Sequence, residues 1–142
     1  MSIGSNHLPI IFAPSVVIKN TEHKGRGVFA AKNFKKGEII ETSPVVYLSP
    51  KERTHSEHTI FAYYLYPWTS TRCGVMVLGY GSIYNHSFTP NATWEQDFQA
   101  KTMIYRATSN IKKDEEILVN YNGETETQAP IDWFDEFKEK YH

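Results

Sequence analysis

The sequence contains very little cysteine, since Cys73 is the only one among 142 residues. A single cysteine cannot form an internal disulfide, and it cannot supply the cluster of thiolates that holds a structural zinc ion. His55 and His58 have the spacing of metal ligands on a helix, but no third or fourth ligand accompanies them. We therefore expect no metal site.

Long apolar runs are also lacking. The longest candidate, residues 75–78, is far shorter than the roughly 20 residues of a membrane-spanning helix. The first fourteen residues contain two prolines and lack the basic region of a signal peptide. We therefore expect an intracellular, soluble protein without membrane contact, in either the cytoplasm or the nucleus.

The whole chain has almost no net charge, but its two parts carry opposite charge. The formal net charge is −1, yet residues 1–113 carry 13 Lys/Arg and 7 Asp/Glu, a net +6, and residues 114–142 carry 2 and 9, a net −7. The acidic end is either a solvated helix face or a surface that attracts a basic peptide. The overall balance predicts no direct binding of nucleic acid.

What the chain does have is enough apolar content, 40% hydrophobic and 14% aromatic residues, for one modest core. Short stretches with strand character recur between turns that contain glycine or asparagine. They are residues 16–19, 28–31, 39–41, 45–47, 75–78, 93–97, 102–107 and 116–121. Strands this short do not favour a parallel sheet with crossover helices.

Helix signals occur in two places. Ser49 and Glu52 have the spacing of a capping box with Pro50 at the first helical position, which predicts one or two short helices between 49 and 66, before the breaker Pro67. Near the end, four apolar residues share one helical face: Ile131, Phe134, Phe137 and Tyr141. The prediction is a mainly β (β+α) domain over 15–142, preceded by a loose arm at 1–14 and ending in an amphipathic helix at about 130–141.

Three segments carry candidate chemistry. The first is Gly25-Arg26-Gly27, the second runs from Asn85 to Asn91 with the sequence Asn-His-Ser-Phe-Thr-Pro-Asn, and the third, 115–121, reads Glu-Glu-Ile-Leu-Val-Asn-Tyr. Each has an ordinary interpretation when taken alone. The glycine pair fits a hairpin turn, His86 fits a hydrogen-bonded core histidine, and Tyr121 fits a packed strand aromatic.

In this order and at these separations, the three segments resemble the marks of the SET-domain family of protein lysine methyltransferases, from about Val16 to the C-terminus. The Asn-His-Ser-x-x-Pro-Asn match is the most specific of the three. The chain is most similar to the small viral and bacterial proteins that consist of little more than this domain, and the run 78–84 before Asn85 is also similar to theirs.

The resemblance implies a fold of short curved sheets with a C-terminal pseudoknot, a short helical insertion and a C-terminal helix. It also implies S-adenosylmethionine as methyl donor, with S-adenosylhomocysteine as product. The expected cofactor-binding residues are Lys24, Gly25, Arg26, Gly27, Asn85, His86 and Trp133. Tyr121 is expected to stand beside the transferring methyl group, in an orienting and electrostatic role more than as a general base, because a tyrosine pKa near 10 leaves it neutral at pH 7.

Other implied roles are open to a core interpretation. Tyr64 and Trp94 resemble aromatic residues of the lysine channel, and Val119 occupies a position that limits methylation in some relatives. The chain lacks the cysteine-rich segment that closes this channel in larger relatives, so we expect the helix at 130–141 to close it.

The predicted function is transfer of a methyl group from S-adenosylmethionine to a lysine of a protein, with histone tails as the leading substrate. The alternative is a catalytically silent SET module that binds a basic peptide or the cofactor. By analogy with the small viral relatives, we also expect a homodimer.

Overall fold

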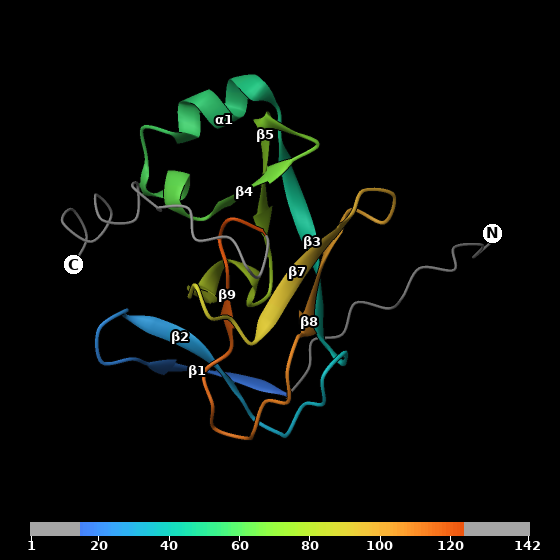
Figure 1. Ribbon diagram of the computed structural model, residues 1–142. Helices are drawn as coiled ribbons and strands as arrows, with labels where there is room; N and C mark the ends of the chain where they lie inside the picture. Colours follow the sequence, from blue (N-terminus) through green and yellow to red (C-terminus); the bar gives the residue numbers. More distant parts are fainter. Residues whose placement is uncertain (1–14, 124–142) are drawn as a thin grey trace.

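The computed structural model describes residues 15–123, and these form a mainly β structure (Figure 1). The elements, in chain order, are β1 (Val16–Asn20), β2 (Arg26–Ala30), β3 (Ile39–Leu48), α1 (Pro50–Ser56), η1 (Ile60–Tyr63), β4 (Leu65–Trp68), β5 (Ser70–Val77), η2 (Gly81–Ile83), β6 (Asn85–His86), β7 (Ala92–Asp97), β8 (Thr102–Ala107) and β9 (Leu118–Val119). The predicted arm at 1–14 and the predicted helix at 130–141, which contains Trp133, lie outside the described residues.

The largest sheet has the strand order β4-β5-β3-β8-β7, and all of its pairs are antiparallel. Strand β3 is the long central element (Figure 1). Its first part pairs with β8, from Ile39 to Pro44, and its last part pairs with β5, from Val45 to Leu48. Because β3 changes partners along its length, the sheet curves, as the right-handed twist of strands favours.

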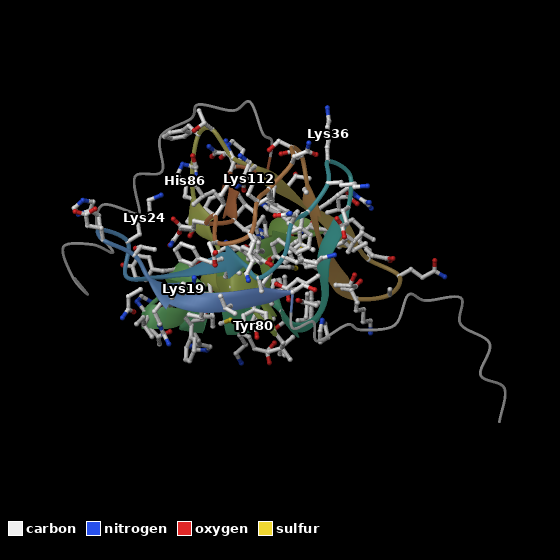
Figure 2. All side chains as sticks on the ribbon, turned by 90° about the horizontal axis from the view of Figure 1, so that it is seen from below. Lys19, Lys24, Lys36, Tyr80, His86 and Lys112 are labelled. Carbon is white, nitrogen blue, oxygen red and sulfur yellow. The ribbon has the colours of Figure 1, made fainter. Side chains whose placement is uncertain are left out.

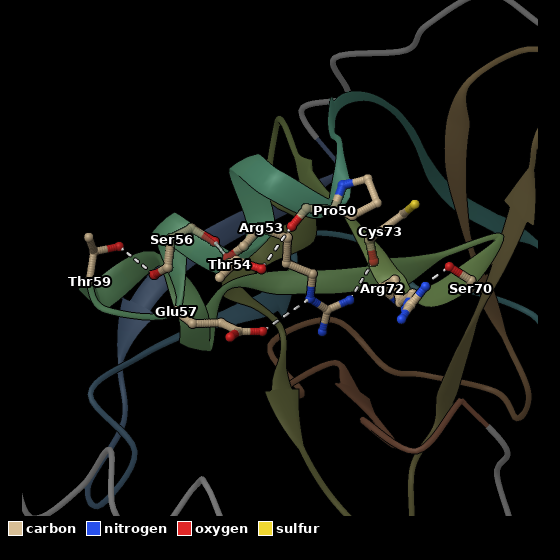
Figure 3. A network of polar contacts seen from close by, with 9 residues as sticks. All are labelled: Pro50, Arg53, Thr54, Ser56, Glu57, Thr59, Ser70, Arg72 and Cys73. Carbon is tan, nitrogen blue, oxygen red and sulfur yellow. Dashed lines mark hydrogen bonds and ion pairs between the residues drawn. The ribbon is translucent and has the colours of Figure 1, made fainter.

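The helical insertion sits at one end of this sheet and is held to it by Arg53 (Figure 3). Ser49 and Glu52 form the predicted capping box, and Pro50 begins α1. The Arg53 guanidinium donates to the carbonyl of Cys73 in β5 and lies 4.0 Å from the Glu57 carboxylate. The prediction of one or two short helices in this region is confirmed.

The prediction that Pro67 acts as a helix breaker is wrong, because Pro67 lies inside β4. Strand β4 is at the edge of the sheet and pairs only with β5, so a residue without an N–H is tolerated there. The tight turn to β5 uses Thr69 with a φ of 57°. No glycine marks that turn, which is why the sequence did not reveal the hairpin.

The segment that ends in β9 runs between two earlier parts of the chain. On one side the Ile117 amide donates to the Val28 carbonyl of β2 at 2.8 Å. On the other side β9 pairs in parallel with β6, and the Ser87 amide donates to the Val119 carbonyl at 3.0 Å. A late segment enclosed in this way by two earlier ones is the arrangement expected of the pseudoknot.

The core lies between the large sheet, the β1–β2 hairpin and this late segment. Its fully enclosed side chains include Val28, Val75, Met103, Ile117 and Val119. Within residues 15–123 no helix is long and apolar enough to cross a membrane. The same part of the chain holds no group of three or more potential metal ligands, and His55 and His58 belong to no such group there.

Candidate active site

The β1–β2 hairpin places the first glycine motif. Gly25 has a φ of 69°, in the region that favours glycine, and its carbonyl accepts hydrogen bonds from both the amide and the hydroxyl of Thr21. The hairpin interpretation is thus correct, and the hairpin also lies beside the Asn-His-Ser segment. The Lys24 ammonium reaches the His86 carbonyl at 3.2 Å, and the two residues lie on the same side of the molecule in Figure 2.

Asn85 connects three segments of the chain. It is only 6% exposed, and its Nδ2 donates to the Arg26 carbonyl at 3.0 Å and to Glu116 Oε1 at 2.8 Å. Both amide hydrogens are therefore in use, which orients the side-chain carbonyl oxygen as the group left for a ligand that donates a hydrogen bond.

Gly27 makes this packing possible. A Cβ atom at Gly27 would overlap the Glu116 carboxylate and would lie 2.9 Å from Asn85 Nδ2. The glycine is required here because of a close approach between side chains and backbone, since Gly27 itself is not among the glycines with a positive φ. In the motif Gly25-Arg26-Gly27, the first glycine thus allows the turn, and the second allows Glu116 and Asn85 to pack closely against the backbone.

His86 is held as a neutral imidazole. Its Nδ1 accepts a hydrogen bond from the Tyr121 amide at 3.1 Å, which assigns the proton to Nε2. Burial lowers the pKa of His86, and the nearby positive charge of Lys24 lowers it further. Nε2 is buried and has no hydrogen-bond partner in residues 15–123. The predicted hydrogen bond of this histidine is therefore present, but His86 is only partly buried and is not a core residue.

Tyr121 lies at the centre of the arrangement. Its hydroxyl donates to the Tyr84 carbonyl at 2.8 Å. Burial raises the pKa of Tyr121 far above its usual range, and the neighbouring Tyr66, Tyr64 and Glu116 raise it further. A phenol that stays neutral in this way can orient a reacting group and stabilise positive charge, but it cannot accept a proton as a base at neutral pH.

A narrow cavity of about 50 Å³ opens beside Tyr121. Most of its wall comes from β4 and from the segment before β6. The lining residues are Tyr63, Tyr64, Leu65, Tyr66, Pro67, Ser82, Tyr84 and Tyr121. The cavity can hold a small group at the end of a chain, and its aromatic walls would exclude water from that group.

The candidate channel residues occupy different positions relative to this cavity. Tyr64 lines it. Trp94 lies behind the wall, with its ring edge-on to Tyr66 at 5.2 Å and its Nε1 donating to the Asn120 carbonyl at 3.2 Å. Val119 is fully enclosed in the core. The roles of Tyr64, Trp94 and Val119 in the channel stay predictions.

The structure thus brings Lys24, Gly25, Arg26, Gly27, Asn85, His86 and Tyr121 together. Sequence reasoning missed Glu116, Asn91 and the tyrosines around the cavity other than Tyr64. Asn91 receives a bond from the Leu118 amide at 2.8 Å and donates to the Glu116 carbonyl at 2.9 Å. Both residues belong to recognised motifs, so their identity was visible although their partners were not.

Comparison with known proteins agrees with this geometry. The family model of the SET domain matches residues 25–122. The chain is 36% identical over 115 residues to a histone-lysine N-methyltransferase of Schizosaccharomyces pombe that is specific for H3 lysine-37, a match that covers 80% of this chain and 77% of the relative. The predicted fold class and enzyme class are confirmed.

Solved structures give the same result. A Plasmodium falciparum protein named as a candidate histone methyltransferase is 36% identical, with a TM-score of 0.63, and the match covers 75% of this chain and 92% of that one. Polycomb Repressive Complex 2 of Chaetomium thermophilum, bound to S-adenosylmethionine, is similar at a TM-score of 0.64 over 75% of this chain and 15% of that one. At 23% identity, this second likeness shows the fold alone.

Proposed function

The chain belongs to the SET-domain family and is a protein-lysine N-methyltransferase, and from that premise we propose that it methylates a lysine of a histone H3 tail with S-adenosylmethionine as donor. The observation that carries the proposal is the position of Tyr121 in the lining of a narrow cavity. Its hydroxyl donates to the Tyr84 carbonyl, and its amide donates to His86 of the Asn-His-Ser segment. The specificity of the yeast relative, for H3 lysine-37, makes that tail the first substrate to test.

The cofactor would be held by residues Lys24 to Gly27, Asn85 and His86, with Trp133 as a further predicted contact. The fit is supported by the oriented Asn85 carbonyl oxygen, which suits the α-ammonium of a methionine moiety, and by the backbone of the Gly25–Gly27 turn, which a ligand can approach closely. When bound, S-adenosylmethionine supplies a methyl group attached to a positively charged sulfur.

The residues of the cavity prepare the substrate lysine. An amine with a pKa near 10.4 must lose its proton before it can attack, which costs about 4–5 kcal/mol at pH 7. Aromatic walls lower that pKa because they remove water from the ammonium form. With its proton released to solvent, the neutral amine would be held by these walls against the methyl group that the cofactor would supply.

Alignment accounts for much of the remaining barrier, since well-oriented groups gain roughly 7–11 kcal/mol. Tyr121 would contribute to it as a fixed oxygen in the cavity lining, since weak C–H···O contacts to a methyl group are worth only about 0.5–1 kcal/mol each. Tyr64, Trp94 and Val119 are proposed to shape the channel, and the segment at 130–141 is proposed to close it. Because histones are nuclear proteins, a histone substrate implies that this enzyme acts in the nucleus.

A homodimer remains part of the proposal. What supports it is exposed apolar side chains on strands, among them Val17 and Ile18 on β1 and Val46 and Tyr47 on β3. Sedimentation at micromolar concentration tests this point, and a monomer would count against it.

The proposal is tested with purified protein, labelled S-adenosylmethionine, and a panel of core histones, nucleosomes and lysate proteins. Tyr121→Phe is the diagnostic variant, and Tyr47→Phe, which removes a hydroxyl of β3 that donates to Cys73 Sγ, is its matched control. We expect label on H3 and a fall of about 100-fold in kcat for Tyr121→Phe, the scale of losing one fixed polar group in an active site. The control should keep the wild-type rate.

Label found only on non-histone proteins would refute the histone assignment. Cofactor binding without label on any acceptor would instead favour the silent SET module.

A further inference from the structure

A carboxyl group is buried on β3, away from the three motifs of the site. Glu41 is only 5% exposed. Its Oε2 accepts hydrogen bonds from the Ser43 hydroxyl at 3.0 Å and from the Tyr80 amide at 3.5 Å, whereas Oε1 is buried without a partner of hydrogen-bonding geometry among the described residues. Burial of a carboxyl group is unfavourable unless its oxygens are satisfied, so this position calls for a reason.

The Tyr84 hydroxyl is the complementary group. It is buried as well, since Tyr84 is 1% exposed, and it too has no partner of good geometry in residues 15–123. The two groups are close enough to influence each other: burial raises the pKa of Glu41, and hydrogen bonding with Tyr84 opposes that rise. A phenol donates and a carboxylate accepts, so the two unsatisfied atoms are complementary in kind.

The carboxyl group also touches the start of the segment that leads to the site. Gly79 has a φ of 66°, and a Cβ atom there would lie 3.2 Å from Glu41 Oε2. The Glu41 carboxylate therefore meets the start of the segment 79–84, through its bond from the Tyr80 amide and its position beside Gly79. The middle of the same segment is fixed separately, because the Gly81 carbonyl accepts bonds from two buried tyrosine hydroxyls.

Tyr84 links this buried group to Tyr121. Its backbone carbonyl accepts the Tyr121 hydroxyl at 2.8 Å, and it lies four residues after Tyr80, whose amide donates to Glu41 Oε2 at 3.5 Å. We infer that Glu41 is a positioning residue for methyl transfer, which holds the segment 79–84 so that the Tyr84 carbonyl orients the Tyr121 hydroxyl. The inference rests on the proposed function, and it adds a residue that belongs to none of the three motifs.

A purely structural role predicts something different. Leucine is similar in size to glutamate but cannot accept the hydrogen bonds of Ser43 and Tyr80, so Glu41→Leu should lose stability in either case, and turnover of the folded protein is what distinguishes the two roles. If Glu41 only filled the core, Glu41→Leu would leave the folded enzyme with its normal turnover. If Glu41 positions Tyr121 through Tyr84, the same variant turns over slowly even when it is folded.

The experiment compares kcat and KM for S-adenosylmethionine in Glu41→Leu, Glu41→Gln, Tyr84→Phe and the double variant Glu41→Leu/Tyr84→Phe. Glu95→Leu, which removes an exposed carboxylate of β7, is the control. Thermal unfolding and circular dichroism establish that each variant folds. We expect kcat of Glu41→Leu to fall about tenfold or more with KM within about twofold, because a small misplacement of reacting groups is costly.

Glu41→Gln should recover most of the turnover, because its amide oxygen can accept from Ser43 and Tyr80 while its NH₂ group donates to the Tyr84 hydroxyl. Tyr84→Phe should lower kcat as well, and the double variant should be no slower than Glu41→Leu, since the two act on one connection. The inference would be overturned by an unchanged kcat in Glu41→Leu, or by equal losses of kcat in Glu41→Leu and Glu41→Gln. It would also be overturned if the loss in the double variant equalled the product of the losses in Glu41→Leu and Tyr84→Phe.

Hydrogen exchange separates this inference from the proposed function. Amides of residues 79–86 and 119–122 should exchange faster in Glu41→Leu than in the wild type or in Glu95→Leu, whether or not the protein transfers label. Unchanged exchange there would overturn the positioning role. If amide exchange is faster in Glu41→Leu but the wild-type protein methylates no acceptor, the proposed function is refuted and the structural connection still holds.

Discussion

The five-stranded sheet and the site segment around β6 and β9 satisfy their backbone groups in different ways. In the sheet, β7 and β8 pair over six consecutive residues. At the site, β6 and β9 pair over only two. Around that short pair, side-chain amides take over the bonding, with Asn91 accepting from the Leu118 amide and Asn85 donating to the Arg26 carbonyl.

The difference explains where the sequence is constrained. A regular ladder is formed by backbone groups that every residue except proline carries, so many side chains suit a given strand position. A site held by asparagine amides and by contacts that only glycine permits needs those residue types and no others. The irregular segment 85–91 is therefore more informative about identity than the whole of the larger sheet.

Glycine replacement tests this contrast most strongly. We expect Gly27→Ala to lower the free energy of unfolding by up to about 3 kcal/mol, because the added methyl group overlaps the Glu116 carboxylate and presses on Asn85. The affinity for S-adenosylhomocysteine should fall with it, since the Asn85 amide must move. Chemical denaturation and isothermal titration calorimetry measure the two effects.

Gly74→Ala is the matched control on β5 of the sheet. A Cβ atom at Gly74 would be 3.4 Å from the flexible Arg53 side chain, an ordinary contact. Its change in stability should stay within about 0.5 kcal/mol, the usual range of a substitution without a clash. Equal losses in the two variants would remove the distinction between sheet and site.

Asn91→Ala sharpens the comparison at a smaller scale. The variant loses two side-chain bonds to the segment before Val119, each worth about 1 kcal/mol, so we expect a loss of roughly 2 kcal/mol in denaturant unfolding. Asn110→Ala loses one exposed bond, to the Lys36 amide, and should cost less than about 1 kcal/mol. If Asn91→Ala lost no more free energy of unfolding than Asn110→Ala, the Asn91 amide would not replace the backbone hydrogen bonds of a regular strand pair.

The smallest expected effect is a pH dependence from His86. Its pKa is lowered in the folded protein, mainly by burial, so His86 binds a proton more weakly in the folded state than in the unfolded state. Stability should therefore be complete above the ordinary value of 6.5 and fall as the pH drops below it, with a slope under about 1.4 kcal/mol per pH unit. Protonation of Nδ1 would also break its bond from the Tyr121 amide.

Urea unfolding between pH 5 and 7.5 measures this slope. The comparison of His86→Leu with wild type cancels the contributions of other groups, and His58→Leu, at an exposed histidine near α1, serves as control. A slope that persists unchanged in His86→Leu would assign it to another group.

Local signals were sufficient for several elements because they act over a few residues. The capping box at Ser49 and the proline at 50 predicted the start of α1 correctly. The alternation in 102–107 predicted β8 with its observed bounds. In contrast, the stretches 39–41 and 45–47 belong to one strand, β3, which also contains Thr42, Ser43 and Pro44 between them.

By itself, the sequence determined the family, the mainly β class and the seven motif residues from Lys24 to Tyr121 that the fold gathers, since these depend on residue identities at fixed separations. Only the tertiary structure decided that Glu116 orients Asn85, that Tyr84 carries the acceptor for Tyr121, and that Glu41 accepts from the Tyr80 amide. Asn85 and Glu116 lie 31 positions apart, Tyr84 and Tyr121 lie 37 apart, and Glu41 and Tyr80 lie 39 apart. No local pattern encodes them, because they arise only when the late segment lies between β2 and β6.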